Sequence, residues 1–242
     1  MTEPVSDDRW GEAQVAEREY WQWPAIDARE FVQILAGLAE AAVWASQRFP
    51  DESPPAGDWL EIGIGPLGIG CIHFLPQAAS KRLVGIDPLE RIHATELSLP
   101  RPLLAAVEVA RSMYEHHLAP GEATALESSS FGLAVLHNVL DHVRDPKAVL
   151  QEARRVLRPK GILFLACDTH SRLHQVRHKL VIRRTDPESW LVRAHPFQFR
   201  PSELFALVDD NGFQVLSHNL ANRLVTETVG KTTRLLILAR RD

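Results

Sequence analysis

The chain has 242 residues, of which 45% are hydrophobic and 24% are charged, and its formal net charge at pH 7 is −4. These values suit one α/β domain with elaborations and give no reason to expect nucleic acid as a partner, while no apolar run approaches the roughly 18 to 20 residues of a membrane span. Cys71 and Cys167 lie in apolar segments and the acidic N-terminus lacks a signal-peptide core, so we expect a cytoplasmic protein without disulfides.

Residues 1–56 are expected to form two helices and a linker ahead of the main domain at 57–242. Residues 9–23 have the pattern of a short amphipathic helix. Residues 27–47 carry an alanine-rich apolar stripe, with Asp27 as N-cap. The first helix holds four aromatic side chains that would either pack it on the core or form a lid over a substrate site: Trp10, Tyr20, Trp21 and Trp23.

The stretch DWLEIGIGPLGIG, residues 58–70, predicts a buried strand, a tight glycine turn and then a helix at 66–78. Its three glycines, Gly63, Gly65 and Gly68, have the spacing G-x-G-x-x-G. Glycines at this spacing let the backbone turn sharply and approach a ligand closely. The turn therefore predicts a site for a nucleotide-like cofactor.

The remaining segments alternate strands with helices. Predicted strands cover 82–86, about 112–118, 132–137, 161–167, 213–218 and 234–239. Predicted helices cover 88–97, 103–114, 145–157 and 203–210. Ser202 is the expected N-cap of the last helix. Residues 168–201 are irregular and basic, and we interpret them as an insertion over the catalytic edge. The alternation predicts a Rossmann-like, doubly wound α/β fold: a mostly parallel seven-stranded sheet with an antiparallel C-terminal edge strand and helices on both faces.

Two residues of the turn discriminate between cofactor classes. Glu61 lies two positions before Gly63, where its carboxylate would face the ligand, repelling a pyrophosphate and favouring an ammonium and a sulfonium. Pro66 removes a backbone N–H that a phosphate would need. Asp87, at the end of the second strand, is placed to accept hydrogen bonds from ribose hydroxyls, a role common to both classes.

From about residue 57 to 168 the chain resembles the class I S-adenosylmethionine-dependent methyltransferases. The motifs that carry the resemblance are the E-x-G-x-G-P-x-G turn, Asp87, GEATALESSSF from Gly121 and HNVLDHVRDP from His137. It implies S-adenosyl-L-methionine as the cofactor and Glu122 as the acid that hydrogen-bonds the adenine amino group. Gly132 departs from the family, which often has Asp there. The further residues expected at the cofactor are Gly63, Gly65, Pro66, Pro88, Ala123, His137 and Asn138.

Methyl transfer to an oxygen is an in-line displacement, so the protein must align donor and acceptor and remove the acceptor's proton. His142, after the fourth strand, and Asp168, at the end of the fifth, are the candidate bases, each with a structural alternative as a satisfied loop histidine or a helix cap. Asp141 beside them would contact the substrate, or orient the loop or the cofactor.

The insertion adds histidines and arginines. His170, His174 and His178 would share one helix face, but no cysteine or acidic third ligand follows at motif spacing, so we expect no metal site. The basic residues here, Arg177 among them, predict either a solvated face or contacts with an anionic acceptor. His170 and His195 are further candidate substrate residues.

The sequence thus predicts an S-adenosylmethionine-dependent methyltransferase that methylates oxygen on a small hydroxylated acceptor. The acceptor would be a saccharide or a related secondary metabolite, because the segments AQVAEREYW and AHPFQFRPSEL are similar to methyltransferases of such pathways. A carbon or nitrogen methyltransferase, a nicotinamide-dependent oxidoreductase and an inactive cofactor-binding scaffold stay open. The formation of a homodimer stays open as well.

Overall fold

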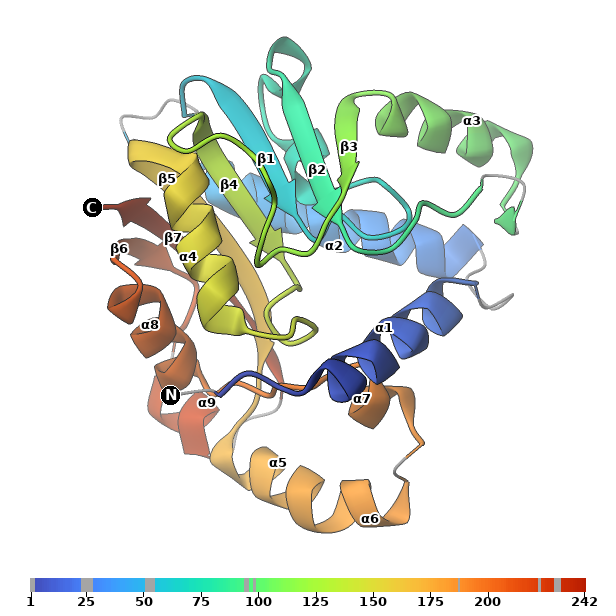
Figure 1. Ribbon diagram of the computed structural model, residues 1–242, viewed down its shortest axis with the longest axis vertical. Helices are drawn as coiled ribbons and strands as arrows, with labels where there is room; N and C mark the ends of the chain where they lie inside the picture. Colours follow the sequence, from blue (N-terminus) through green and yellow to red (C-terminus); the bar gives the residue numbers. More distant parts are fainter. Residues whose placement is uncertain are drawn as a thin grey trace.

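One mixed sheet of seven strands, in the order β3-β2-β1-β4-β5-β7-β6, forms the centre of the molecule (Figure 1). The structure is a computed structural model, and it describes residues 3–22, 28–50, 55–93, 96–97, 99–186, 188–221, 223–228 and 232–242. The strands are β1 (Asp58–Ile62), β2 (Leu83–Asp87), β3 (Tyr114–Leu118), β4 (Phe131–His137), β5 (Leu157–Thr169), β6 (Phe213–His218) and β7 (Thr233–Arg241).

This sheet confirms the predicted fold class. The strands from β3 to β5 run parallel, and β7 is antiparallel to both of its neighbours, β5 and β6. β7 lies one position inside the edge, and β6 forms the edge itself. The carboxyl ends of the parallel strands meet on one side of the sheet, where α/β proteins bind their ligands.

Both faces of the sheet are buried, because alternate side chains of each strand enter two separate hydrophobic clusters. In β1, Leu60 points into one cluster and Trp59 into the other, and both side chains have 0% exposure. Leu163 and Phe164 of β5 divide in the same way. Parallel strands covered on both sides require this continuous apolar sequence.

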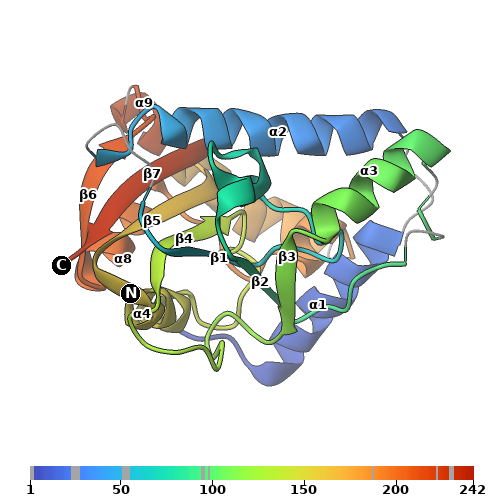
Figure 2. The same cartoon turned by 90° about the horizontal axis from the view of Figure 1, so that it is seen from above.

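Helices cover the two faces of the sheet (Figure 2). α2 (Ala28–Ser46) runs along one face, and α4 (Pro146–Val156) and α8 (Pro201–Asp210) cover the other, while α3 (Arg101–Arg111) precedes β3. Asp27, the predicted N-cap of α2, lies outside the described residues. Within the described ranges, no helix has the length and apolar character needed to cross a membrane.

A further layer lies across the carboxyl ends of the parallel strands (Figure 1). It combines the N-terminal helix with the segment after β5 that is predicted as an insertion. Its helices are α1 (Asp7–Gln22), α5 (Arg172–Arg177), α6 (Arg183–Thr185) and α7 (Trp190–Arg193), with a π-helical stretch, His178–Ile182, between α5 and α6.

The predicted helix at 66–78 is wrong. The chain after the glycine turn forms only two 3-10 helices, Cys71–Phe74 and Ala78–Ser80. Pro66 and Pro76 lack the N–H groups that a continuous α-helix would use, and the ring of Pro76 would clash with the preceding turn. The predicted helix at 88–97 is likewise absent from the described part of that segment.

The start and surroundings of α8 also differ from the prediction. Ser202 lies inside the first turn and is not the N-cap. The N–H of Arg200 donates to Oε2 of Glu203 at 2.8 Å, and the hydroxyl of Ser202 donates to Glu227. Glu227 belongs to α9 (Arg223–Thr228), a short helix that the sequence pattern does not predict.

Candidate active site

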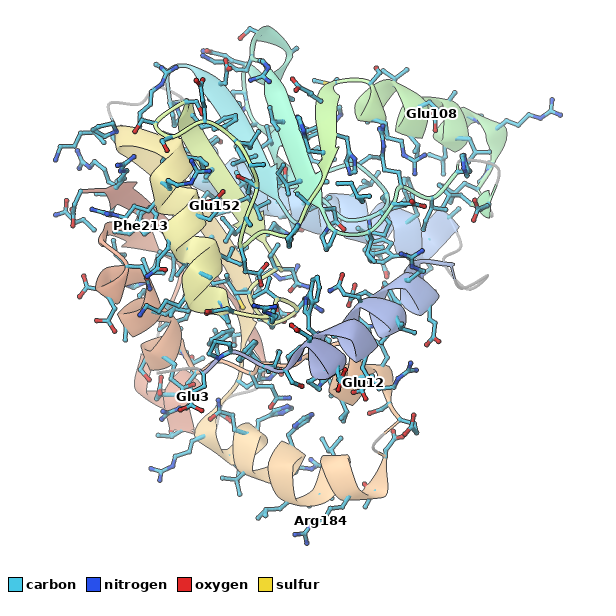
Figure 3. All side chains as sticks on the ribbon, viewed as in Figure 1. Glu3, Glu12, Glu108, Glu152, Arg184 and Phe213 are labelled. Atoms are coloured by element: carbon cyan, nitrogen blue, oxygen red, sulfur yellow. The ribbon has the colours of Figure 1, made fainter. Side chains whose placement is uncertain are left out.

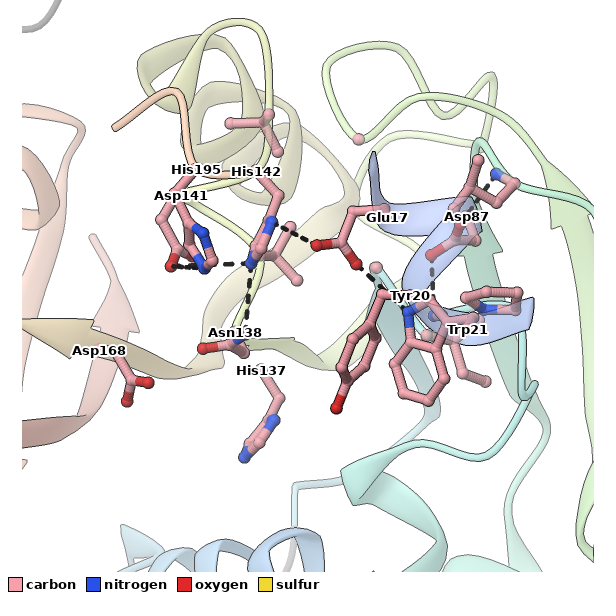
Figure 4. A pocket seen from close by; sticks show the side chains of 18 of the residues that line it. Glu17, Tyr20, Trp21, Asp87, His137, Asn138, Asp141, His142, Asp168 and His195 are labelled. Carbon is pink, nitrogen blue, oxygen red and sulfur yellow. Dashed lines mark hydrogen bonds and ion pairs between the residues drawn. The ribbon is translucent and has the colours of Figure 1, made fainter. Parts of the chain in front are cut away.

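A cavity of about 480 Å³ lies between the carboxyl ends of the strands and the layer that contains α1. The ends of β1, β2, β4 and β5 line it, together with α1, α7 and the loops after the strands. Figure 4 shows Asp141, His142 and His195 gathered at one end of this space and Asp87 at the other. The cavity therefore joins most of the predicted site residues in one place.

The glycine turn forms one wall of the cavity. Gly63 and Gly65 have φ angles of 76° and 74°, which glycine adopts without strain. A Cβ atom on Gly63 would lie 2.3 Å from Cγ2 of Val139, so the turn packs directly against the loop after β4. Pro66 and Pro88, both expected near the cofactor, also line the cavity.

Asp87 holds this turn in place. Its Oδ2 accepts a hydrogen bond from the N–H of Gly65 and its Oδ1 one from the N–H of Leu89, each at 2.8 Å. Burial raises the pKa of Asp87 to about 6, although the two backbone hydrogen bonds act in the opposite direction. A carboxylate oxygen accepts more than one hydrogen bond, so Asp87 keeps acceptor capacity toward the cavity that it lines.

Glu61 lines the cavity, but its carboxylate turns toward the backbone. Oε1 accepts a hydrogen bond from the N–H of Cys71 at 2.7 Å, and Oε2 accepts from the N–H of Ile72 at 3.0 Å and the hydroxyl of Tyr114 at 3.2 Å. Burial raises the pKa of Glu61 to about 7, against these hydrogen bonds. The expectation that the carboxylate simply faces the ligand is corrected, because both oxygens bind the chain itself.

Glu122 and Ala123, expected together at the adenine, separate in the structure. Glu122 lines the cavity, and its Oε1 accepts hydrogen bonds from the N–H groups of Arg144 and Asp145 at 2.9 and 3.0 Å. It thereby ties its own loop to the start of α4. Ala123 is exposed and lies outside the cavity lining, so its place beside the adenine stays a prediction.

β4 ends at His137, and the side chains of His137 and of Asn138, the next residue, line the cavity. Within the described part of the chain, Nε2 of His137 and Oδ1 of Asn138 are buried without a hydrogen-bond partner. Burial, helped by the charge of Arg234, lowers the pKa of His137 to about 4, so its ring is neutral. Buried polar atoms normally have partners, so these two are candidates for ligand contacts.

His142 lies between two carboxylates. Its Nδ1 is 3.0 Å from the carbonyl oxygen of Ala194 and 3.0 Å from Oε1 of Glu17, and its Nε2 is 3.7 Å from Oδ2 of Asp141. Burial alone would lower the pKa of His142, but the charges of Asp141 and Glu17 raise it to about 9. The ring is therefore a positively charged imidazolium at neutral pH, whereas a general base must be neutral to accept a proton.

Asp168, the other predicted base, is paired with Arg234 of β7. Nε of Arg234 is 2.9 Å from Oδ1 of Asp168, and Nη2 is 3.2 Å from Oδ2. Both carboxylate oxygens are thus engaged by one guanidinium. Taking a proton from an acceptor would first require Asp168 to break this pair.

Asp141 and His195 complete a cluster with His142. Oδ2 of Asp141 is 3.8 Å from Nε2 of His195, whose Nδ1 is 3.1 Å from the carbonyl oxygen of Leu191. The rings of His142 and His195 have centroids 4.4 Å apart. Burial and the charge of His142 lower the pKa of His195, so its ring is neutral. Two residues predicted to contact the substrate thus adjoin a predicted base.

His170 lines the cavity as predicted, whereas Arg177 does not. Burial, followed by the charge of His174, lowers the pKa of His170 to about 4. Arg177 is exposed and absent from the cavity lining, so the structure does not bring it together with the other predicted substrate residues. Arg184, near the end of the same segment, points away from the sheet (Figure 3).

Glu17 is a site residue that the sequence analysis missed. With Trp10, Gln14 and Trp21 it forms a stripe at helical spacing along the face of α1 that lines the cavity. The available signal was the presence of Gln14 and Glu17 between the aromatic residues, because a helix that packs only on a core presents apolar residues at this spacing. Trp23, the fourth aromatic residue considered for this helix, lies outside the described residues.

α1 is fastened to α7 across the mouth of the cavity. The guanidinium of Arg9 donates to the carbonyl oxygens of Arg193 and Val192 at 2.7 and 2.6 Å. The ring of Tyr20 stacks on that of Trp190, with centroids 4.9 Å apart. Two segments far apart in the sequence thus cover the cavity together.

Residues 36–218 match the family model of a methyltransferase domain. The match covers 183 of the 242 residues, and the chain belongs to this methyltransferase family. The predicted class, the S-adenosylmethionine-dependent methyltransferases, is thereby confirmed, and S-adenosylmethionine is the cofactor of that class.

Two curated proteins are similar to parts of the chain. The ubiquinone biosynthesis O-methyltransferase of Histophilus somni is 32% identical over 110 residues, which are 41% of this chain and 43% of the relative. A 37.1 kDa protein in a transposon of Streptomyces fradiae is 34% identical over 115 residues, which are 47% of this chain and 31% of the relative. The chain thus spans less than half the length of either relative.

A solved structure resembles the whole chain. It is the 1,6-didemethyltoxoflavin-N1-methyltransferase of Burkholderia thailandensis with bound 1,6-didemethyltoxoflavin and S-adenosylhomocysteine. Its TM-score is 0.61 at 15% identity, and the comparison covers 100% of this chain and 93% of that chain. At this identity the likeness shows the fold. The Histophilus somni relative is named as an O-methyltransferase, and the Burkholderia thailandensis structure is named as an N1-methyltransferase. The comparisons therefore do not define which atom this chain methylates.

Proposed function

We propose that the protein transfers the methyl group of S-adenosylmethionine to a hydroxyl oxygen of a small, neutral acceptor, a saccharide or a related secondary metabolite. One observation carries the proposal: a single cavity connects the glycine turn with the polar cluster of Asp141, His142 and His195. A methyltransferase needs donor and acceptor in line within one enclosed space. The family match supports the donor, and the shape of the cavity supports the small acceptor.

The cofactor occupies the half of the cavity beside the glycine turn. Gly63, Gly65 and Pro66 form its wall, Asp87 accepts from the ribose hydroxyls, and Glu122 lies near the adenine. Six carboxylates line the cavity, which favours a ligand that carries an ammonium and a sulfonium over a pyrophosphate. They are Glu17, Glu61, Asp87, Glu122, Asp141 and Asp168.

The acceptor occupies the other half, between the cluster and the aromatic side chains of Tyr20 and Trp190. A neutral acceptor suits this lining, because Arg234 is paired with Asp168 and Arg177 lies outside the cavity. Aromatic faces stack on the apolar faces of sugars and on planar rings alike. We therefore no longer assign an anionic group to the acceptor.

In the reaction, a lone pair of the acceptor oxygen forms the new bond to the methyl carbon. The bond from that carbon to sulfur breaks, and its electron pair stays on sulfur, which becomes a neutral thioether. The hydroxyl proton leaves toward the cluster of Asp141, His142 and His195, which replaces the His142 and Asp168 pair as the place of proton removal. Positioning and proton removal are the protein's main contributions.

The proposal is tested by calorimetry with S-adenosylhomocysteine and with NADH, followed by a screen of acceptors with a labelled methyl donor. We expect S-adenosylhomocysteine to bind, NADH not to bind, and label to appear in a neutral polyhydroxylated or phenolic compound. Binding of NADH alone would refute the methyl-donor site. Label that appears only on ring nitrogens or on anionic acceptors would refute the proposed acceptor.

A further inference from the structure

We infer that Asp141, His142 and His195 form a binding site for a divalent cation of the Zn²⁺ type at the acceptor end of the cavity. Each residue offers one ligand atom, and the three atoms lie within 4.8 Å of one another. Oδ2 of Asp141 is 3.7 and 3.8 Å from Nε2 of His142 and His195. Ligands of a tetrahedral zinc ion lie about 3.4 Å apart, so shifts of about an ångström or less would bring the three atoms around one ion.

The surroundings of the Asp141 carboxylate are compatible with a bound cation. Its side chain is buried, with 2% of the residue exposed. In the part of the chain that the structure describes, its one hydrogen-bond donor is the thiol of Cys167, with Sγ 3.9 Å from Oδ1. Both imidazole nitrogens stay beyond hydrogen-bond distance of Oδ2. A thiol is a weak donor, so the charge of this buried carboxylate is balanced mainly by the ring of His142, 3.7 Å from Oδ2. A divalent cation bound between them would take over that role.

The outer contacts of the two histidines orient them as metal ligands. Nδ1 of His142 faces the carbonyl oxygen of Ala194 and the carboxylate of Glu17, and Nδ1 of His195 faces the carbonyl oxygen of Leu191. With a proton kept on each Nδ1, both Nε2 atoms can bind the ion. At His142 the ion would replace the second proton of the ring and its contact with Nδ2 of Asn138, which lies 3.4 Å from Nε2. Ligating histidines typically donate their other N–H to a carbonyl or carboxylate in this way.

The ligand set also indicates the kind of ion. Two imidazoles and a carboxylate suit Zn²⁺ and its first-row neighbours, whereas Mg²⁺ and Ca²⁺ prefer oxygen ligands. Three protein ligands leave a fourth position open toward the cavity, as in catalytic zinc sites. We assign an acceptor oxygen to that position. This assignment rests on the proposed function, whereas the binding of the ion does not.

The inference is tested by titrating the metal-stripped protein with ZnCl₂ in a calorimeter and with CoCl₂ by visible absorption. We expect one ion per chain and a tetrahedral Co²⁺ spectrum. Asp141→Asn and His195→Gln should each weaken Zn²⁺ binding by more than about 100-fold, because each removes a ligand. Glu17→Gln should weaken it by about 10-fold, since Glu17 is an outer partner.

The matched control is His174→Gln, because His174 also lines the cavity but lies outside the cluster. It should keep the wild-type affinity, and circular dichroism should show all variants folded. The inference is overturned if the wild type binds no stoichiometric ion, or if both ligand variants bind as it does. An ion bound in a protein that methylates nothing would support this site and refute the proposed function. Full activity after chelation would overturn the assigned acceptor position.

Discussion

At the scale of single residues, the acids of the glycine turn organise the backbone before they meet any ligand. Asp87 accepts from the N–H of Gly65, and Glu61 accepts from the N–H groups of Cys71 and Ile72. These bonds hold the turn in the open shape that lines the cavity. The cofactor therefore meets a wall that is already ordered, which lowers the entropy cost of binding.

We predict that Glu61 makes the folded protein less stable as the pH rises. Its pKa is about 7 in the folded protein and 4.5 without burial, so its contribution is fully present below pH 4.5 and is lost as the pH rises through 7. The loss amounts to about 3 kcal/mol. Urea unfolding from pH 4.5 to 8 should show a decline that is about 3 kcal/mol larger in the wild type than in Glu61→Gln, which keeps the smaller decline caused by Asp87. Parallel pH profiles for the two proteins would contradict the prediction.

A second prediction concerns Gly63→Ala. The new Cβ would meet Val139 at 2.3 Å, on a backbone with φ of 76°, so we expect a loss of about 2 to 4 kcal/mol in unfolding free energy and weaker S-adenosylhomocysteine binding. Gly11→Ala is the control, because a Cβ on Gly11 of α1 would meet nothing within 4 Å. It should leave the protein as stable or up to about 1 kcal/mol more stable. Equal losses in both variants would refute the steric explanation.

At the scale of helices and strands, the sheet could be predicted from the sequence, and residues 168–201 are expected over its catalytic edge. The contacts that join α1 to this segment could not be predicted. Continuous apolar runs such as 131–137 identify the buried strands. Because the carboxyl ends of parallel strands meet at one edge of the sheet, the sequence predicts that Asp87, His137 and Asp168 lie close together, and all three line the cavity. The pairing of Glu17 with His142 joins segments that are distant in the sequence. Local periodicity holds no information about such a contact.

The helix predicted after the glycine turn does not form. The cause lies in the local sequence, but the hydrophobic periodicity of the segment does not reveal it. Apolar residues recur through 66–78, but Pro66, Gly70 and Pro76 interrupt the hydrogen bonds that a helix requires. The prediction of Ser202 as N-cap fails for another reason: it rests on residue type alone, and serine is a favourable N-cap. Glu203 instead accepts a hydrogen bond from the N–H of Arg200, and α8 therefore starts two residues earlier, with Arg200 as its N-cap.

We predict that α1 opens more readily when its attachment to α7 is weakened. Arg9→Ala removes the hydrogen bonds to the carbonyl oxygens of Val192 and Arg193, and about 10-fold faster hydrogen exchange in α1 should follow, which corresponds to about 1.4 kcal/mol. The KM for the cofactor should rise, because Glu17 and Trp21 line its cavity. Arg18→Ala, an exposed arginine of the same helix, is the control. Identical exchange in both variants would show that Arg9 does not hold α1.

At the scale of the whole molecule, β7 joins the parallel part of the sheet to its edge strand. Ile237 pairs with Leu165 of β5 and His218 of β6 and has 0% exposure. We predict that Ile237→Ala lowers the unfolding free energy by 2 to 5 kcal/mol, as is typical for a large core residue. Val109→Ala on α3, where Val109 is 68% exposed, should change it by less than about 0.5 kcal/mol. Thermal and urea unfolding of both variants measure the contrast, and similar losses would contradict it.

The place of β7 also governs the order in which the protein can be completed during translation. β7 follows β6 in the chain but lies between β5 and β6 in space. Until β7 leaves the ribosome, β5 has an unpaired edge, β6 has no neighbour in the sheet, and Asp168 lacks Arg234. An open strand edge in a nascent chain invites association with other chains. The newly made protein therefore passes through an interval in which Asp168 is unpaired and the edge of β5 is open to other chains.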